Sequence, residues 1–135
     1  MPDQIELQTN DETRVLRLSE INRSRDGSGY AYQCCLLVRS CGFSCERPFY
    51  FDDYHLRQAV AGLQAMGDMT PGEAVLAYRD EKDCVRLASN ERGQVVVSGE
   101  IYQFSDLSQS LRFGFRTDQT VLGPLVRDLE DLLEA

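Results

Sequence analysis

Residues 111–135, LRFGFRTDQTVLGPLVRDLEDLLEA, change the spacing of their apolar residues within four residues of Thr117. Before this point apolar and polar residues alternate, which predicts a strand with one buried face, formed by Leu111, Phe113 and Phe115. After it, apolar residues recur at steps of three and four, which predicts a helix with the stripe Val121, Leu122, Leu125, Val126, Leu129, Leu132 and Leu133. Asp118 or Thr120 can cap its start. Because one face of the strand needs a cover, we expect this helix to pack on the sheet.

Upstream of residue 111, alternating apolar residues and turn signals predict further short strands. They fall near residues 5–7, 16–21, 30–38, 43–51, 74–78, 85–87 and 94–104. The two glycines of Arg25-Asp-Gly-Ser-Gly29 predict a loop, and Gly42 predicts a hairpin turn between the strands at 30–38 and 43–51.

A first helix is predicted after residue 51. Asp52 or Asp53 can cap it, and it should end at Gly67. Its apolar stripe is Leu56, Ala59, Val60, Leu63 and Met66. Because the connections between strands are too short for parallel crossovers, we predict an α+β fold. It is an antiparallel sheet or sandwich of about eight strands with two helices, in one domain spanning residues 1–135.

Composition limits the possible partners. The chain has 135 residues, with 14 basic and 22 acidic side chains, and a net charge of −8. This charge repels nucleic acid and anionic lipid, so we expect neither as a partner. The chain lacks the roughly 20 consecutive apolar residues that span a membrane, and its first residues lack the pattern of a signal peptide. We therefore expect a cytoplasmic protein whose partner is another protein, in particular a basic one, and the oligomeric state stays open.

The five cysteines form no paired Cys-x-x-Cys motif. Cys34 and Cys35 are adjacent, so in a strand they point to opposite faces and cannot hold one ion together, and both are predicted to belong to the core. Cys41 and Cys45 come close together if the chain turns at Gly42, and they are then free, bridged or half of a metal site. Buried free thiols are the favoured state, and no metal or cofactor is predicted.

No catalytic motif is present in the sequence. Its sole histidine, His55, follows Asp52 and Asp53, but no nucleophile is marked for it. Helix capping explains these carboxylates better than acid and base chemistry does. Glu100 and Tyr102 likewise suit the wet face of a strand. We therefore predict no catalytic residues and no enzyme activity.

Acidic side chains cluster in two places, and these are the candidate partner-binding residues. The clusters consist of Asp80, Glu81 and Asp83, and of Asp128, Glu130, Asp131 and Glu134. A concentrated negative field accelerates encounter with a basic protein, although the same charge also serves solubility.

Three segments carry a resemblance to small bacterial domains of uncharacterised families. They are Ser40–Cys45, Gln94–Ile101 and Leu111–Leu125, and the most specific part is Phe-x-Phe-x-Thr-Asp-Gln-Thr within residues 113–120. The resemblance covers about residues 30–135. Some members are labelled as immunity proteins of polymorphic toxin systems, which implies a domain that binds a cognate toxin without catalysis.

Three functions therefore compete. The first is a cytoplasmic protein-binding module, such as an immunity protein that neutralises a toxin through an acidic surface. The second is a module that binds a small ligand in a cleft between sheet and helix. The third is an enzyme, which would require His55 to meet a thiol or carboxylate in a cleft.

Overall fold

The structure is a computed structural model, and it describes residues 2–9, 11, 13–27, 29–68, 70–79, 82–104 and 107–134. These described residues form eight strands, two α-helices and one short 3₁₀ helix. Their bounds are β1 Gln4–Glu6, β2 Arg14–Asp26, β3 Gly29–Ser40, β4 Phe43–Asp52, α1 Asp53–Gly67, β5 Glu73–Ala77, β6 Cys84–Ser89, β7 Gln94–Gln103, β8 Gln109–Asp118, η1 Gln119–Val121 and α2 Leu122–Glu134.

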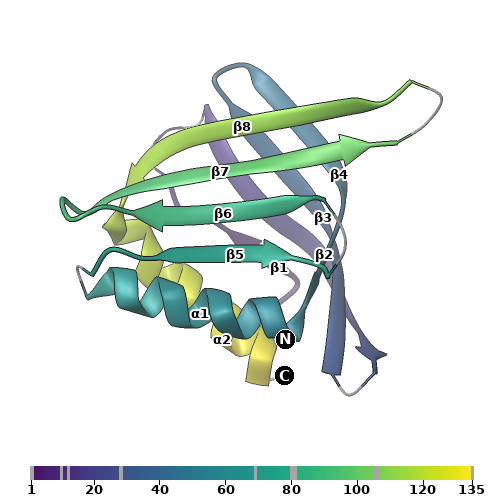
Figure 1. The fold of residues 1–135 in the computed structure, drawn as a ribbon, viewed down its shortest axis with the longest axis horizontal. Helices are drawn as coiled ribbons and strands as arrows, with labels where there is room; N and C mark the ends of the chain where they lie inside the picture. The colour runs from purple at the N-terminus through teal and green to yellow at the C-terminus, as the bar shows by residue number, and fades with distance from the viewer. Residues whose placement is uncertain are drawn as a thin grey trace.

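The strands form two antiparallel sheets. The N-terminal sheet has the order β1-β2-β3-β4 and the C-terminal sheet the order β5-β6-β7-β8, so neighbours in sequence are neighbours in space. Figure 1 shows the strands of the C-terminal sheet crossing in front of those of the N-terminal sheet at a large angle. The predicted α+β class with antiparallel strands and a C-terminal helix packed on the sheet is confirmed.

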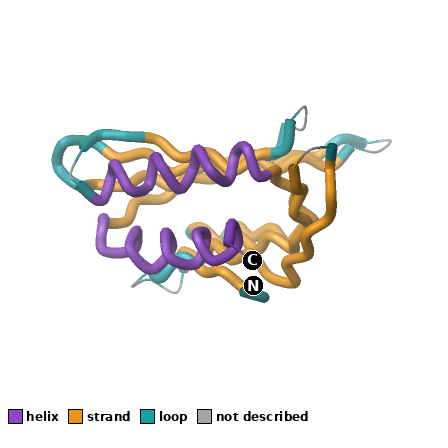
Figure 2. Tube along the Cα trace, turned by 90° about the horizontal axis from the view of Figure 1, so that it is seen from below, coloured by secondary structure: helices purple, strands orange, loops and turns teal. Residues whose placement is uncertain are grey.

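α1 and α2 close one side of the two layers. Figure 2, seen from below, shows them side by side. α1 ends the N-terminal half of the chain but packs along β5 of the C-terminal sheet, while α2 contacts β1 of the N-terminal sheet. Each sheet therefore has its first strand covered by the helix of the other half. Within the described ranges, no helix is long and apolar enough to cross a membrane.

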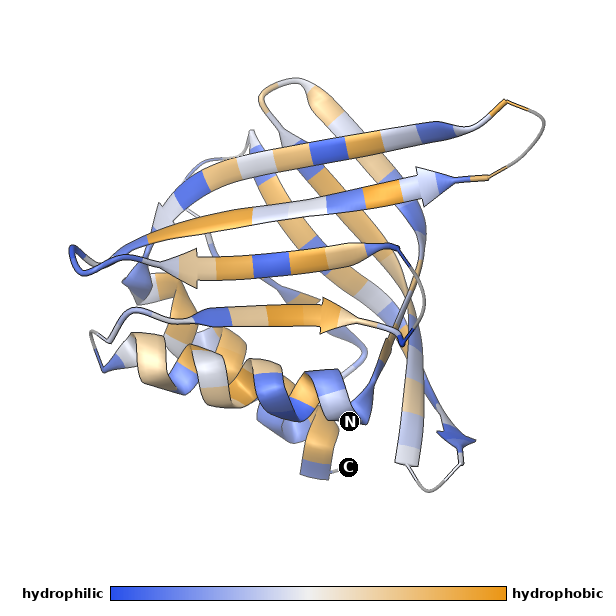
Figure 3. Ribbon diagram, in the orientation of Figure 1, coloured by the Kyte–Doolittle hydropathy of each residue, from blue (hydrophilic) through white to orange (hydrophobic). Residues whose placement is uncertain are grey.

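A single apolar core joins the two sheets and the helices. The predicted stripe of α1 is buried in full, and Leu122, Leu125, Leu129 and Leu132 are buried on α2. Figure 3 shows apolar and polar residues alternating along the strands, as expected for sheets with one buried face. Residues from both halves belong to the same cluster, so the halves share their interior.

Two details of the N-terminal sheet differ from the sequence prediction. The glycines near residue 27 make a tight hairpin and not a loop, because Asp26 pairs directly with Gly29 and Gly27 has a φ of 65°. A bulge between Ser19 and Asn22 shifts the register of β2 on β3. This one extra residue turns Ile21 inward although it is out of phase with the buried residues before it.

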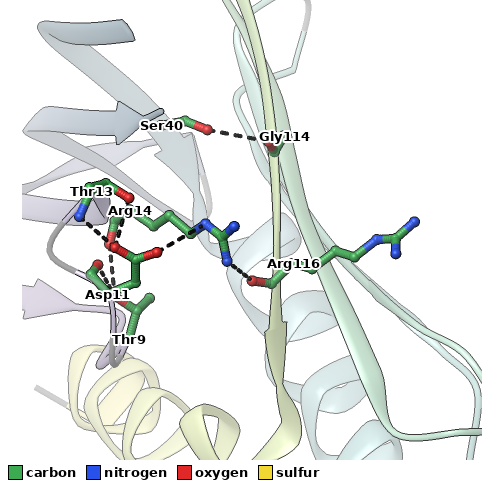
Figure 4. Close-up of polar contacts among 7 residues, drawn as sticks. All are labelled: Thr9, Asp11, Thr13, Arg14, Ser40, Gly114 and Arg116. Carbon is green, nitrogen blue, oxygen red and sulfur yellow. Dashed lines mark hydrogen bonds and ion pairs between the residues drawn. The ribbon is translucent and has the colours of Figure 1, made fainter. Parts of the chain in front are cut away.

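The outer edge of β8 is capped by side chains from the N-terminal sheet. The Ser40 hydroxyl donates to the carbonyl of Gly114 at 3.3 Å, and the Arg14 guanidinium donates to the carbonyl of Arg116 at 3.2 Å (Figure 4). Asp11 pairs with Arg14 at 3.5 Å and so holds it in place. Such contacts satisfy edge carbonyls that would otherwise be open to another strand.

Candidate functional site

Those of the predicted acidic residues that the structure describes belong to separate elements. Asp80 and Glu81 lie outside the described residues. Asp128, Glu130, Asp131 and Glu134 lie on α2, where Asp131 and Glu134 are exposed. Glu130 accepts a hydrogen bond from Gln64 of α1 at 2.5 Å, so it also joins the two helices.

Asp83 lies elsewhere, in the connection between β5 and β6. Its carboxylate accepts the backbone N–H of Tyr102 at 2.9 Å, next to the β7–β8 connection. Figure 1 shows this end of the C-terminal sheet beside β4 and away from α2. Of the described acidic residues proposed for binding, Asp83 therefore belongs to the β5–β6 connection and contacts β7, whereas the others lie on α2.

The β7–β8 connection exposes large apolar side chains. Phe104 is 64% exposed and Leu107 is 80% exposed, which is unusual for residues of this size in a polar turn. The Phe104 ring stacks on that of Tyr102, with centroids 5.7 Å apart and planes only 3° apart. The Lys82 ammonium lies 5.7 Å from the centre of the Phe104 ring. We call Tyr102, Phe104 and Leu107 the hairpin patch.

Polar contacts on the C-terminal sheet involve Tyr102 of the hairpin patch. The Tyr102 hydroxyl donates a short hydrogen bond to Glu100, which pairs with Arg112 at 3.1 Å. The hydrogen bond from Tyr102 lowers the pKa of Glu100 and, reciprocally, raises that of Tyr102. The Tyr102 ring that makes this hydrogen bond is also the ring on which Phe104 stacks.

Beside the hairpin patch, a cleft opens between β4 and the β7–β8 hairpin, and we call it the end cleft. Its volume is about 130 Å³. It is lined by Cys45, Arg47, Ile101, Tyr102, Gln103, Gln109, Ser110 and Leu111. Burial raises the pKa of the Cys45 thiol, the nearby Arg47 lowers it, and Asp83 raises it further. The charge of Asp83 therefore acts on Cys45, a residue that lines the end cleft.

Two residues that line the end cleft each carry a buried side-chain atom without a hydrogen-bond partner among the residues that the structure describes. These atoms are Nε of Arg47, a donor, and Oε1 of Gln103, an acceptor. A buried polar atom left unpaired costs about 1–3 kcal/mol, so such atoms call for an explanation at each position.

His55 lies in a polar cluster that joins the two halves. Its Nδ1 is 2.8 Å from Oδ1 of Asp52, which also caps α1 by accepting the backbone N–H of His55. The other oxygen of Asp52 accepts the backbone N–H of Arg79 at 3.2 Å. The imidazole therefore meets a carboxylate, but the hydrogen bonds described for the ring include none with a thiol. Asp52 and His55 thus have structural roles: Asp52 caps α1 and also links α1 to Arg79 of the β5–β6 connection.

The cysteines are free thiols in different surroundings. Cys34 is buried, and burial raises its pKa to about 12, whereas the neighbouring Cys35 is only half-buried on the opposite face. Cys41 is exposed in the β3–β4 turn, where its φ is 51° and that of Gly42 is 90°. The turn predicted at Gly42 is confirmed, but Cys35 and Cys41 do not lie in the core as buried thiols. Among the described residues, no group of three or more metal-ligating side chains is found.

A second cavity lies inside the core between the sheets and helices. It is lined by apolar residues from both halves, and its volume is only about 20 Å³. Small-molecule sites typically measure about 300–1,000 Å³, so this position between sheet and helix does not accommodate a metabolite.

Comparison with protein-family models, curated proteins and solved structures finds no match for this chain. Sequence reasoning missed Phe104 and Leu107 because Phe104 was assigned to the end of a strand. The signal was present, since two large apolar residues within a polar turn have no core to enter.

Proposed function

We propose that this protein is a binding module for another protein and acts by contact, without bond chemistry of its own. The observation that carries the proposal is the hairpin patch, in which Phe104 and Leu107 are exposed and Phe104 is held on Tyr102. Rigid aromatic residues beside a cleft are typical anchors of protein interfaces.

The net charge of −8 favours a basic partner. Asp83 contributes negative charge beside the hairpin patch, and the exposed acids of α2 add to the field that a partner meets at longer range. The sequence resemblance to immunity proteins makes a toxin the specific form of partner that we propose. A gene for a large toxin-like protein next to the gene for this chain would support that form.

The proposal is tested by capture of partners from the source cell at low salt, using the wild-type protein and a double variant, Phe104→Ser with Leu107→Ser. The matched control is Phe43→Ser, because Phe43 is 69% exposed but lies in the β3–β4 hairpin. We expect one protein to be retained by the wild type and by the control and lost from the double variant.

Binding is then measured with the purified partner. We expect the double variant to weaken Kd by at least about tenfold, as for truncation of interface anchors. We also expect affinity to fall as salt rises, because the attraction between opposite charges is screened. Recovery of no partner, or equal binding by the double variant and the Phe43→Ser control, would refute the proposal.

A further inference from the structure

The end cleft has room for one large apolar side chain. Its volume of about 130 Å³ lies below the range of sites for small-molecule ligands, about 300–1,000 Å³. An apolar cavity of about 150 Å³ accommodates a benzene molecule. Ile101, Leu111 and Cys45 provide apolar surface in the lining. The cleft therefore fits a single aliphatic or aromatic group.

The same end of the molecule presents apolar side chains of this size. Leu107 is 80% exposed and Phe104 is 64% exposed. β6 pairs with β7 only as far as Glu100, whereas β7 and β8 stay paired out to Gln103 and Gln109. Figure 1 shows this end of β7 and β8 running past β6. The two side chains therefore belong to a two-stranded projection, from which they reach a neighbouring molecule.

The described residues of this hairpin leave the cleft of their own chain open. Tyr102, Gln103 and Gln109 line the cleft. Phe104 and Leu107 are not among the residues that line it. One surface thus carries a cavity for an apolar side chain and, in the adjoining hairpin, an apolar side chain of matching size. A two-fold symmetric dimer requires such a self-complementary surface, because each copy contributes the same patch.

The charges around the end cleft are of both signs. Arg47 lines the cleft, and the charge of Asp83 acts on Cys45 in the lining. The Lys82 ammonium lies 5.7 Å from the centre of the Phe104 ring. Two copies that meet here therefore do not bring only like charges together. Their net charge of −8 each opposes approach at longer range, and salt screens this repulsion.

We infer that two copies of this chain form a two-fold symmetric dimer, in which Leu107 of each copy enters the end cleft of the other. Phe104, in the same connection as Leu107, is covered by this contact. The inference does not rest on the proposed function but goes beyond it. The dimer covers the hairpin patch, so a second copy and a protein partner compete for one surface.

The first test is sedimentation velocity of the purified protein over a range of protein and salt concentrations. We expect a reversible dimer whose affinity rises with salt, because screening weakens the repulsion between two copies of charge −8. Binding of a basic partner has the opposite salt dependence, so the two associations are distinguishable. A chain that stays monomeric up to about 1 mM at high salt would overturn the inference.

Two variants test the contact itself. Leu107→Ser removes the inserted side chain, and Cys45→Phe fills the cleft that receives it. We expect each to weaken the dimer at least about tenfold, as for loss of an interface anchor. The matched control is Phe43→Ser, because Phe43 is 69% exposed but lies in the β3–β4 hairpin, and it should leave Kd unchanged. Dimers of Leu107→Ser as tight as those of the control would contradict the contact.

A mixture of the two variants tests the reciprocal arrangement. In a mixed dimer, Leu107 of the Cys45→Phe copy meets the open cleft of the Leu107→Ser copy, so one of the two contacts is retained. Native mass spectrometry separates the three dimers by mass. We expect the mixed dimer to exceed the abundance given by random pairing, which would also show that Cys45→Phe is folded. Random abundance would overturn the reciprocal contact.

Thiol labelling of the wild type gives a readout that depends on no variant. Raising the protein concentration through the Kd of the dimer should slow the modification of Cys45 and leave that of Cys41, exposed in the β3–β4 turn, unchanged. Equal rates for Cys45 at low and high concentration would refute insertion into the cleft. Because these tests use the chain alone, a monomeric result leaves the proposed function intact, and failure to capture a partner leaves the dimer intact.

Discussion

The two halves of the chain, residues 4–67 and 73–134, repeat one order of described elements, four antiparallel strands followed by a helix. Their sheets are nevertheless closed by different contacts. The first strands, β1 and β5, are covered by helices of the opposite half. The last strands differ, because β8 has carbonyls capped by Ser40 and Arg14, whereas β4 borders the end cleft. The difference teaches that each sheet edge is covered or capped by its own set of contacts. The candidate site lies beside β4, at the edge where such capping is not described.

The largest effect is expected at the contact between α1 and β5. A methyl group on Gly62 would lie 2.2 Å from the backbone carbonyl oxygen of Glu73, which cannot move aside as a flexible side chain would. Gly62→Ala should therefore push α1 off β5 and lower the free energy of unfolding by about 1–3 kcal/mol or more. Urea denaturation followed by circular dichroism measures this loss.

The matched control is Gly123→Ala in the first turn of α2. A methyl group there would meet nothing within 4 Å. We expect no loss, and a gain of up to about 1 kcal/mol from reduced freedom of the unfolded chain. Equal effects of the two substitutions on stability would contradict the close backbone contact between α1 and β5.

An intermediate effect is expected at Asp52, which joins the end of β4 to α1 and to the β5–β6 connection. Burial raises its pKa, but hydrogen bonds from His55 and the Arg79 backbone outweigh burial, and the net pKa lies below its ordinary value. Asp52→Ala should lower stability at neutral pH by about 0.5–2 kcal/mol through loss of the cap.

The pH dependence of this effect has a defined sign. Because the folded-state pKa of Asp52 is depressed, its stabilisation is complete above the unfolded value of about 3.9 and is lost as pH falls through the lower folded value. Denaturation at a series of pH values should show the gap between wild type and Asp52→Ala narrowing below about pH 4. A gap that stays constant down to pH 2 would mean that the ionised carboxylate is not what stabilises this junction.

The smallest effect is expected at the capped edge of β8. Ser40→Ala removes the hydrogen bond to the Gly114 carbonyl and should cost about 0.5–1.5 kcal/mol. Ser44→Ala, at an exposed position beyond the same turn, serves as the control and should change stability by less than about 0.5 kcal/mol. If hydrogen exchange in β8 is equally fast in the two variants, side-chain capping does not protect this edge.

The sequence predicted much of the fold because the strands and helices carry regular patterns. The stripe of α1 follows from helical spacing, and a cap at Asp52 or Asp53 follows from the chemistry of free backbone amides. The structure shows that Asp52 is the cap. The change of spacing near Thr117 predicted β8 and α2 in the same way. The bulge that turns Ile21 inward was not predictable, since it depends on the pairing of β2 with β3 and not on any residue pattern.

The candidate site was not predictable to the same degree. The acidic residues were visible as a charge pattern, but their separation between the β5–β6 connection and α2 follows from how the sheets cross. The end cleft joins Arg47 of the N-terminal half to Gln103 of the C-terminal half, which lie more than fifty positions apart in the sequence. No local pattern links them.

The sequence by itself determined the elements, their apolar faces and the net charge, because these depend on neighbouring residues and on composition. Only the tertiary structure decided which helix covers which sheet, which edges are capped and where Phe104 is left exposed beside a cleft. The physical reason is that backbone hydrogen bonding and side-chain period act over a few residues, whereas packing joins surfaces regardless of their distance along the chain.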